Sequence, residues 1–293
     1  CSYNLGLRGK TAYIPEYPVG TAPELAEQVA EFVPIARAIL GLRGLKLITF
    51  GPRPDDFLAC NGPIKALYDL GVAVEENSEL ELLVAYNKHA DDPRIPAKMA
   101  EMQAELGGNN KYAGVLPRLA QYELTLLDWA EAHKGARQYV AFANKCWPAF
   151  QTEFKFVPCY VNSRLAAMGI PVSCEVDIYG ALSEYIGVCV SGAPTTLLDI
   201  NNTVPASIYD KAIGGRYDVR LPETFMGFHC GNTSCAMLKD PHMGYQLIMK
   251  RDLEPELPEP DITRGTMGKQ IRRSIHGKQQ DIILIKLCKI WLG

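Results

Sequence analysis

The sequence predicts an α/β protein in which consecutive Rossmann-like or flavodoxin-like domains are built around parallel sheets. Two observations predict this class. Short continuous apolar runs, such as 45–50, are typical of strands that are buried on both faces of a sheet. Segments with helix-capping signals and helical periodicity alternate with these runs, a repeat typical of parallel sheets covered by helices. The length of 293 residues also exceeds that of one typical domain.

The first predicted helix runs from about Ala22 to Leu40. Thr21 and Glu24 form a capping-box signal at its start, and Pro23 occupies the permitted first turn. Apolar residues then recur at helical spacing: Leu25, Val29, Phe32, Val33, Ile35, Ala36 and Ile39. Glycines end the helix, and 45–50 follows as a strand.

The middle of the chain repeats the pattern of strand, loop and helix. Asp55 or Asp56 caps a predicted helix that continues through Tyr68. The remaining elements expected here are a strand at 72–74, a helix that begins near Ser78 with Glu81 at the capping-box position, a long loop with a short helix over 91–110, a helix at 116–132 and a strand at 138–143.

Strands near 172–176, 195–200 and 225–230 continue the α/β pattern toward the C-terminus. We therefore expect one α/β domain over 1–140 and a second over 141–254. Residues 255–293 are expected to form an extended, proline-rich linker followed by an anomalous tail that is first basic and then apolar.

Composition excludes several classes of protein. The formal net charge of −3 gives no electrostatic footprint for nucleic acid. No apolar run reaches the roughly 18 residues that span a bilayer, and no signal peptide opens the chain. The nine cysteines are odd in number and lie in apolar runs, which favours free thiols in a reducing compartment. We therefore expect a cytoplasmic protein that binds neither membrane nor nucleic acid.

Two acidic residues, Glu153 and Asp177, each follow or end an apolar, strand-like run. Side chains just beyond the carboxyl ends of parallel strands face the ligand crevice of an α/β protein. Two carboxylates there can hold a divalent metal and move a proton. The plainer alternative is a pair of solvated surface acids. Glu175 competes with Asp177 for the second role, because strand alternation would place both on one face.

The segments around these acids resemble the L-fucose isomerase family, within the L-fucose/L-arabinose isomerase superfamily. The resemblance runs from about Leu45 to Gly265 and is carried by six segments in order: 50–61, 74–82, 142–154, 158–185, 197–202 and 228–232. It implies an isomerase that interconverts an aldose and a ketose, with a manganese ion held by a Glu, an Asp and a His. Glu153 and Asp177 match the first two ligands.

The resemblance also implies a partial chain. The family has a further α/β domain before this point and a β-rich substrate domain that is truncated here, together with the late His that is its third ligand. His229, at the end of a predicted strand, is the candidate replacement; a core histidine is the equal alternative. Zinc binding by His229, Cys230 and Cys235 lacks a second close pair of ligands.

The implied reaction moves a proton between two adjacent carbons of a free sugar such as L-fucose or D-arabinose. The implied cofactor is Mn²⁺ or another divalent ion, and a homo-oligomer is expected. Candidate substrate contacts are Trp147, Gln151 and Asn201, for which core packing and turn formation are the alternatives. Arg53 is interpreted as a surface residue. Two other functions stay open: a non-catalytic sugar-binding or structural protein, and a glycosidase that uses the paired carboxylates.

Overall fold

The computed structural model describes residues 2–109, 113–146, 149–228 and 233–237. Its centre is a parallel sheet of four strands: β1 (Leu45–Phe50), β2 (Ala73–Asn77), β3 (Tyr139–Ala143) and β4 (Val172–Ser173). The strand order is β2-β1-β3-β4, and every pair in this sheet is parallel. The predicted α/β class is confirmed.

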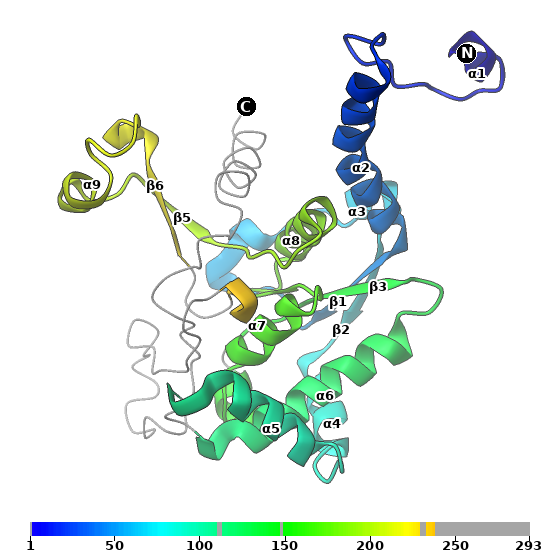
Figure 1. Ribbon diagram of the computed structural model, residues 1–293. Coiled ribbons are helices and arrows are strands. Elements are labelled where there is room, and N and C mark those ends of the chain that lie inside the picture. Colours follow the sequence, from blue (N-terminus) through cyan, green and yellow to red (C-terminus); the bar gives the residue numbers. More distant parts are fainter. Residues whose placement is uncertain (1, 110–112, 147–148, 229–232, 238–293) are drawn as a thin grey trace.

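Helices cover both faces of the sheet (Figure 1). On one face lie α4 (Glu79–Lys88), α5 (Ile95–Leu106), α6 (Leu116–His133) and α7 (Cys159–Ala167). On the other lie α3 (Lys65–Asp69), α8 (Ile178–Ser191) and the end of α2 (Ala22–Gly44). The two faces have separate cores because side chains alternate along each strand: Ile48 and Phe50 of β1 join one core, and Leu45 and Leu47 join the other.

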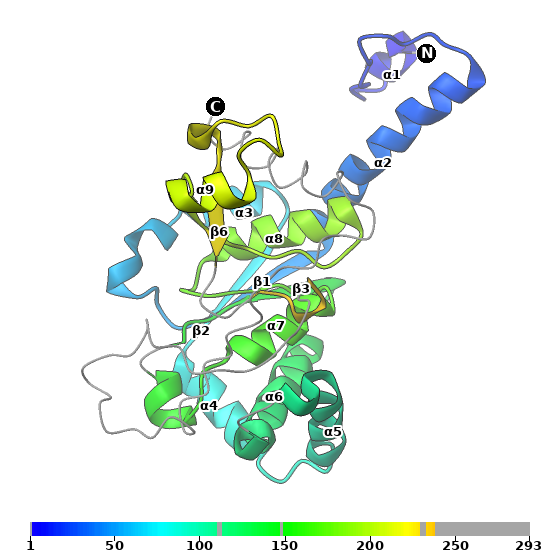
Figure 2. The same ribbon diagram turned by 60° about the vertical axis from the view of Figure 1, so that its left-hand side comes forward.

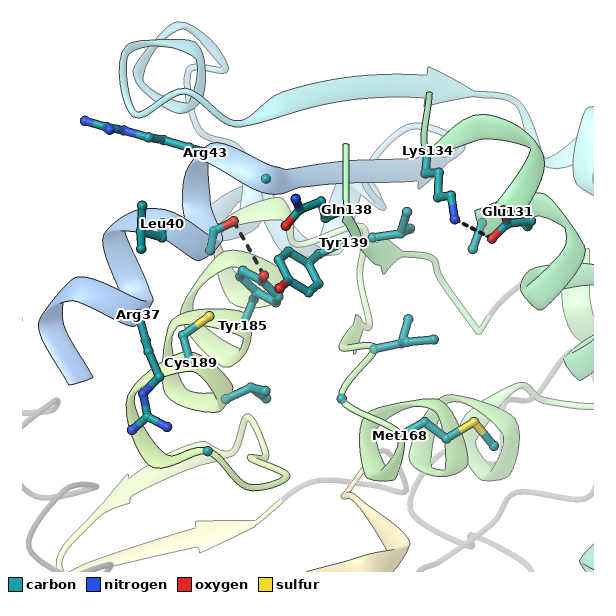
Figure 3. Close-up of a pocket in the computed structure, with 18 of the residues that line it drawn as sticks. Arg37, Leu40, Arg43, Glu131, Lys134, Gln138, Tyr139, Met168, Tyr185 and Cys189 are labelled. Atoms are coloured by element: carbon teal, nitrogen blue, oxygen red, sulfur yellow. Dashed lines mark hydrogen bonds and ion pairs between the residues drawn. The ribbon is translucent and has the colours of Figure 1, made fainter. Parts of the chain in front are cut away.

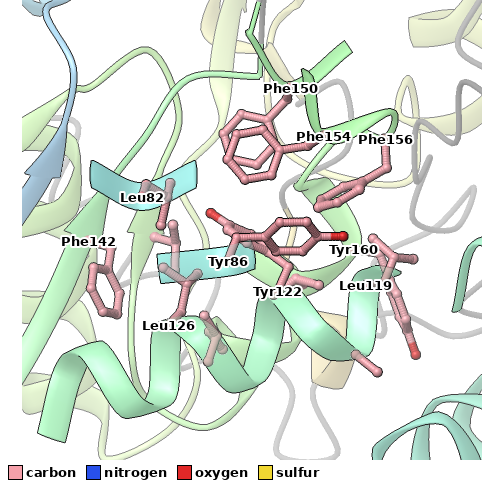
Figure 4. Close-up of a cluster of buried hydrophobic side chains, with 14 of the residues drawn as sticks. Leu82, Tyr86, Leu119, Tyr122, Leu126, Phe142, Phe150, Phe154, Phe156 and Tyr160 are labelled. Atoms are coloured by element: carbon pink, nitrogen blue, oxygen red, sulfur yellow. The ribbon is translucent and has the colours of Figure 1, made fainter. Parts of the chain in front are cut away.

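The larger core is rich in aromatic rings (Figure 4). Tyr122 of α6 is fully buried and contacts Phe150, Phe154 and Phe156 at ring-centroid distances of 5.3, 6.2 and 5.5 Å. These three phenylalanines follow β3 in the chain. The core therefore fixes the segment through which the chain leaves the sheet.

The predicted capping boxes form. The Glu24 carboxylate accepts hydrogen bonds from the backbone and side chain of Thr21 at the start of α2, and Glu81 does the same for Ser78 at the start of α4. The amino-terminal part of α2, with α1 (Ser2–Leu7), projects away from the sheet (Figure 2). Several of its apolar side chains are exposed, among them Val29 and Ile35.

Two predicted elements differ from the structure. The single helix expected up to Tyr68 is divided into a short 3₁₀ helix, Asp55–Cys60, and α3, because Pro63 lies between them. The short helix expected within the loop over 91–110 is present as α5, but it is twelve residues long and buries Met102 and Leu106 against the core. Tertiary packing outweighed the turn-forming residues that flank this helix.

The strands after β4 do not extend the parallel sheet. β5 (Asp199–Asn202) and β6 (Phe225–Phe228) form a separate antiparallel pair, with α9 (Ala206–Ala212) between them in the chain. The strands expected near 195–200 and 225–230 are therefore present, but they pair with each other and not with the parallel sheet. The linker, the tail over 255–293 and the start of a third domain lie outside the described residues.

The four-stranded sheet contains strands from both sides of residue 140, where a domain boundary was predicted. β3 pairs with β1 along all of β3, from Tyr139 opposite Leu45 to Ala143 opposite Thr49. Within the part of the chain that the structure describes, no helix is long and apolar enough to cross a membrane.

Candidate functional site

Glu153 lies in a single π-helical turn, Phe150–Phe154, that follows β3. Its neighbours in this turn are core residues: Phe150 and Phe154 are 1% and 2% exposed and stack with ring centroids 4.4 Å apart. Glu153 itself is exposed. The two rings anchor the turn in the core and leave the carboxylate accessible to a ligand. Turns of this kind occur frequently at functional sites.

Asp177 is the N-cap residue of α8. Its carboxylate accepts a hydrogen bond of 2.8 Å from the backbone amide of Gly180. Burial raises the pKa of the Asp177 carboxyl, while backbone hydrogen bonds from Gly180 and Tyr179 and the charge of Arg53 act in the opposite direction. Asp177 is thus a half-buried acid held at a helix N-terminus, where the helix dipole favours its negative charge.

The two acids follow neighbouring strands. β3 and β4 pair in parallel, with Ala143 opposite Ser173, so their carboxyl ends lie at the same edge of the sheet. Asp177 comes four residues after the end of β4, and Glu153 comes ten residues after the end of β3. Convergence of the two carboxylates on one ion stays a prediction.

Glu175 does not obey the strand alternation that was expected to align it with Asp177. β4 ends at Ser173, and both Glu175 and Val176 have left-handed backbone conformations, with φ values of 61° and 52°. This turn brings Glu175 to Cys174 and Cys146, and one ligand atom from each of the three lies within 4.8 Å of the others. Glu175 therefore belongs to a thiol cluster.

Arg53 contributes a positive charge near Asp177 that its sequence context did not indicate. The residue is half-buried after β1, and its Nε is buried without a hydrogen-bond partner among the described residues. Its charge acts on Asp177 and on Cys60. Burial, followed by the charges of Asp177, Glu175 and Cys174, raises the pKa of the Cys60 thiol to about 11. The loop after β1 thus contributes a cation to the same edge of the sheet.

The remaining candidates for substrate and metal contacts lie wholly or partly outside the described part of the chain. Trp147 and His229 lie outside the described residues. The backbones of Gln151 and Asn201 belong to the π-helical turn and to β5, and their side chains are outside the description. Phe150, at the start of the same turn, is a core residue.

A second group of potential metal ligands, His89, Asp92 and Asp128, already has a cation. The guanidinium of Arg94 contacts Asp92 and Asp128 at 2.6 Å each, and His89 contacts Asp128 at 3.0 Å. This group joins the ends of α4 and α5 to α6 by ion pairs. We interpret it as structural.

A groove lies at the opposite edge of the sheet (Figure 3). It is lined at the amino ends of β1 and β3 by Gly44 and Tyr139, and from the helices by residues that include Arg37, Tyr185 and Cys189. Ligand crevices of parallel α/β sheets lie at the carboxyl ends of the strands. The groove is therefore separate from the candidate site formed around Glu153 and Asp177.

The comparisons with known proteins all point to sugar isomerases of one family. The N-terminal domain model of the fucose/sulfoquinovose isomerases matches residues 1–43, which extends the resemblance upstream of Leu45. A sulfoquinovose isomerase from Clostridium sp. (strain MSTE9) is 27% identical over 201 residues, covering 68% of this chain and 40% of the relative. One from Priestia aryabhattai is 24% identical over 205 residues, covering 68% and 45%.

A third sulfoquinovose isomerase, from Alkalicoccus urumqiensis, is 22% identical over 160 residues, or 55% of this chain and 35% of the relative. The chain thus spans less than half the length of the curated relatives that it matches. The matched domain model and these relatives point to the same family as the resemblance found in the sequence. The chain is therefore similar to the fucose isomerase-like family, both in the matched N-terminal domain model and in these relatives.

Proposed function

We propose that the protein carrying this chain is an aldose–ketose isomerase, an intramolecular oxidoreductase that acts on a free sugar. The observation that carries the proposal is the position of Glu153 and Asp177 after the carboxyl ends of two neighbouring parallel strands. The similarity to sulfoquinovose isomerases supports the same class of reaction.

The reaction requires a base that removes a proton from the carbon beside the carbonyl and returns it to the adjacent carbon, through an enediol. Glu153 has the accessibility that this task needs, since its side chain is exposed. Asp177 is held by the amide of Gly180, which restricts its carboxylate to one orientation. A positioned acid or base contributes about 10²–10⁴-fold to such a step. We assign proton transfer to these two acids.

The donor groups fit the divalent ion that the family resemblance implies. Carboxylate oxygens are hard ligands of the kind preferred by Mn²⁺ and Mg²⁺. Glu153 and Asp177 would hold the ion, with His229 as the proposed third ligand outside the described residues. When bound, such an ion stabilises negative charge on the sugar oxygens. Neighbouring Arg53 adds positive charge from this chain itself.

Two sources suggest candidate substrates. The family resemblance suggests L-fucose or D-arabinose, and the names of the relatives add sulfoquinovose as a candidate. Trp147, Gln151 and Asn201 are proposed as substrate contacts. A cytoplasmic homo-oligomer is the proposed form of the enzyme.

The test is formation of ketose by the longest protein that carries this chain. L-Fucose, D-arabinose, L-arabinose and sulfoquinovose are supplied separately, with Mn²⁺ and after treatment with a chelator. We expect turnover of at least one sugar and its loss in Glu153→Gln and Asp177→Asn. The exposed Glu27→Gln on α2 serves as the matched control and keeps full activity. No ketose from any of the four sugars contradicts the proposal.

The second candidate is a sugar-binding or structural protein without turnover. It is favoured by one observation: the Asp177 carboxylate already has a structural role as the N-cap of α8, where it accepts a hydrogen bond from the amide of Gly180. Calorimetric titration of the same sugars distinguishes the two. Saturable sugar binding without any ketose supports the second candidate, and ketose formation removes it.

A further inference from the structure

Two thiols and a carboxylate gather at the carboxyl ends of β3 and β4. Cys146 follows β3, while Cys174 and Glu175 follow β4, and one ligand atom from each lies within 4.8 Å of the other two. Neither cysteine is in a disulfide. We propose that Cys146, Cys174 and Glu175 form a binding site for a thiophilic divalent cation of the zinc class, separate from the acids assigned to catalysis.

The spacing of the three groups suits a tetrahedral ion. Zinc binds thiolate sulfur at about 2.3 Å and carboxylate oxygen at about 2.0–2.2 Å, so ligand atoms around one ion lie roughly 3.5–3.8 Å apart. Small side-chain rotations bring atoms that are within 4.8 Å of one another to that separation. Three protein ligands leave the fourth position for water or another small ligand.

The backbone explains how residues adjacent in sequence reach the same point. In a regular strand, Cys174 and Glu175 would face opposite sides of the sheet. The left-handed conformation at Glu175 breaks this alternation directly after the strand. Two hydrogen bonds brace the junction: the Asn144 amide donates to the carbonyl of Ser173 at 3.0 Å, and the Val176 amide donates to the carbonyl of Asn144 at 2.9 Å.

The surroundings suit a soft cation with access from one side. Cys146 and Cys174 are 6% and 4% exposed, and Phe57 packs against both. Glu175 is half-buried, so the carboxylate side of the cluster reaches the surface. A water-poor environment around the sulfurs strengthens their attraction for a divalent ion.

Ligand type separates this site from the proposed manganese ligands. Thiolates select zinc and similar ions, whereas carboxylates and water suit magnesium and manganese. Asp177 lies only two residues beyond Glu175 in the chain. Two ions of different classes would therefore bind at the same edge of the sheet. Zinc would bind the two thiolates and Glu175, and it would not displace manganese from Glu153 and Asp177.

The test uses Co²⁺ as the probe in the purified, reduced protein, because thiolate ligands give cobalt a charge-transfer absorption that oxygen ligands do not. We expect one thiolate-bound cobalt per chain, displaced by one zinc. Cys146→Ser and Cys174→Ser should each abolish the thiolate absorption, and Glu175→Gln should weaken cobalt binding at least tenfold. Cys189→Ser is the matched control, since this thiol lies at the groove on the opposite edge, and it keeps the signal.

Two further measurements keep the result independent of folding and of the isomerase proposal. X-ray absorption on the zinc-loaded, unaltered protein should show two sulfur ligands at about 2.3 Å. The variant Glu153→Gln/Asp177→Asn should keep the cobalt–thiolate signal while losing isomerase activity. No retained zinc, a sulfur count other than two, or an undiminished signal in Cys146→Ser/Cys174→Ser overturns the proposal.

Discussion

Asn144 and Asn162 exchange a pair of amide hydrogen bonds in the core, with Nδ2 of each donating to Oδ1 of the other at 3.1 and 3.0 Å. Nδ2 of Asn144 also lies 3.0 Å from the hydroxyl of Tyr122, to which it donates. Asn144 directly follows β3, so these contacts tie the exit of the central strand to α6 and α7. The side-chain amide of Asn144 is thus occupied inside the fold.

Replacing Asn162 by Ala should lower the free energy of unfolding by about 1–3 kcal/mol, because Asn144 is left with an unsatisfied buried amide. Urea denaturation measures the change. Asn87→Ala, on the exposed side of α4, is the control and should change stability by less than about 0.5 kcal/mol. Equal stability of the two variants would contradict the assigned role of the pair.

Replacing one partner of the buried ion pair between Arg164 and Glu123 should destabilise the protein more than replacing both. The Arg164 guanidinium contacts Glu123 at 2.6 Å and Glu105 at 2.5 Å, and Glu123 is fully buried. Arg164→Met leaves buried carboxylates without their main cation and should cost about 3–5 kcal/mol. Arg164→Met/Glu123→Leu should recover much of that loss in the same unfolding experiment. A double variant as unstable as the single one would show that shape matters more than charge.

Glu184 should make stability depend on pH. It is buried in α8, and burial raises the pKa of its carboxyl to about 8 from an ordinary value of 4.5. The folded state therefore retains a proton that the unfolded state loses. The stabilisation that this protonation gives is complete below pH 4.5 and is lost as pH rises through 8, at up to about 1.4 kcal/mol per pH unit.

Glu184→Gln removes this titration. Its free energy of unfolding should fall less steeply between pH 5 and pH 8 than that of the unaltered protein, and the difference should be largest near pH 8. Denaturant titrations at several pH values measure both curves. Parallel curves for the two proteins would show that Glu184 titrates normally.

Substitutions at Asp177 separate its structural role from its proposed catalytic role. Asparagine is as good an N-cap as aspartate, so Asp177→Asn should keep the stability of α8 while isomerase activity is lost. Asp177→Ala should lose activity and also about 1 kcal/mol of stability. Thermal unfolding together with the ketose assay distinguishes the two changes. Full activity in Asp177→Asn would remove this residue from the catalytic set.

Local signals predicted much of the fold. The start of α2 at Thr21, the start of α4 at Ser78 and the strand at 45–50 depend on contacts within a few residues, and the structure contains all three. The helix expected within 91–110 is longer than predicted, because α5 gains stability from burying Met102 and Leu106 against the core. The pairing of β5 with β6 likewise depends on residues more than twenty positions apart.

The candidate site could be predicted from the sequence only where it depends on local signals. The strand ends before Glu153 and Asp177 could be read from apolar runs. The left-handed turn at Glu175 has no glycine to signal it, and the thiols of Cys146 and Cys174 meet only because β3 and β4 are neighbours. The burial of Arg53 also depends on distant packing, and a surface residue was the natural interpretation from sequence.

The π-helical turn at Phe150–Phe154 determines the direction in which the Glu153 side chain leaves the backbone. Each residue of an α-helix advances the side-chain direction by about 100°, and each residue of the wider π-helix advances it by somewhat less. The stacked rings of Phe150 and Phe154 fix the two ends of the turn, so the residues between them determine where the carboxylate points. Deleting one of those residues would keep the composition of the core and the acid itself, yet turn Glu153 by about a quarter of a revolution. In this part of the chain, the length of one turn is as much a property of the site as the identity of its acid.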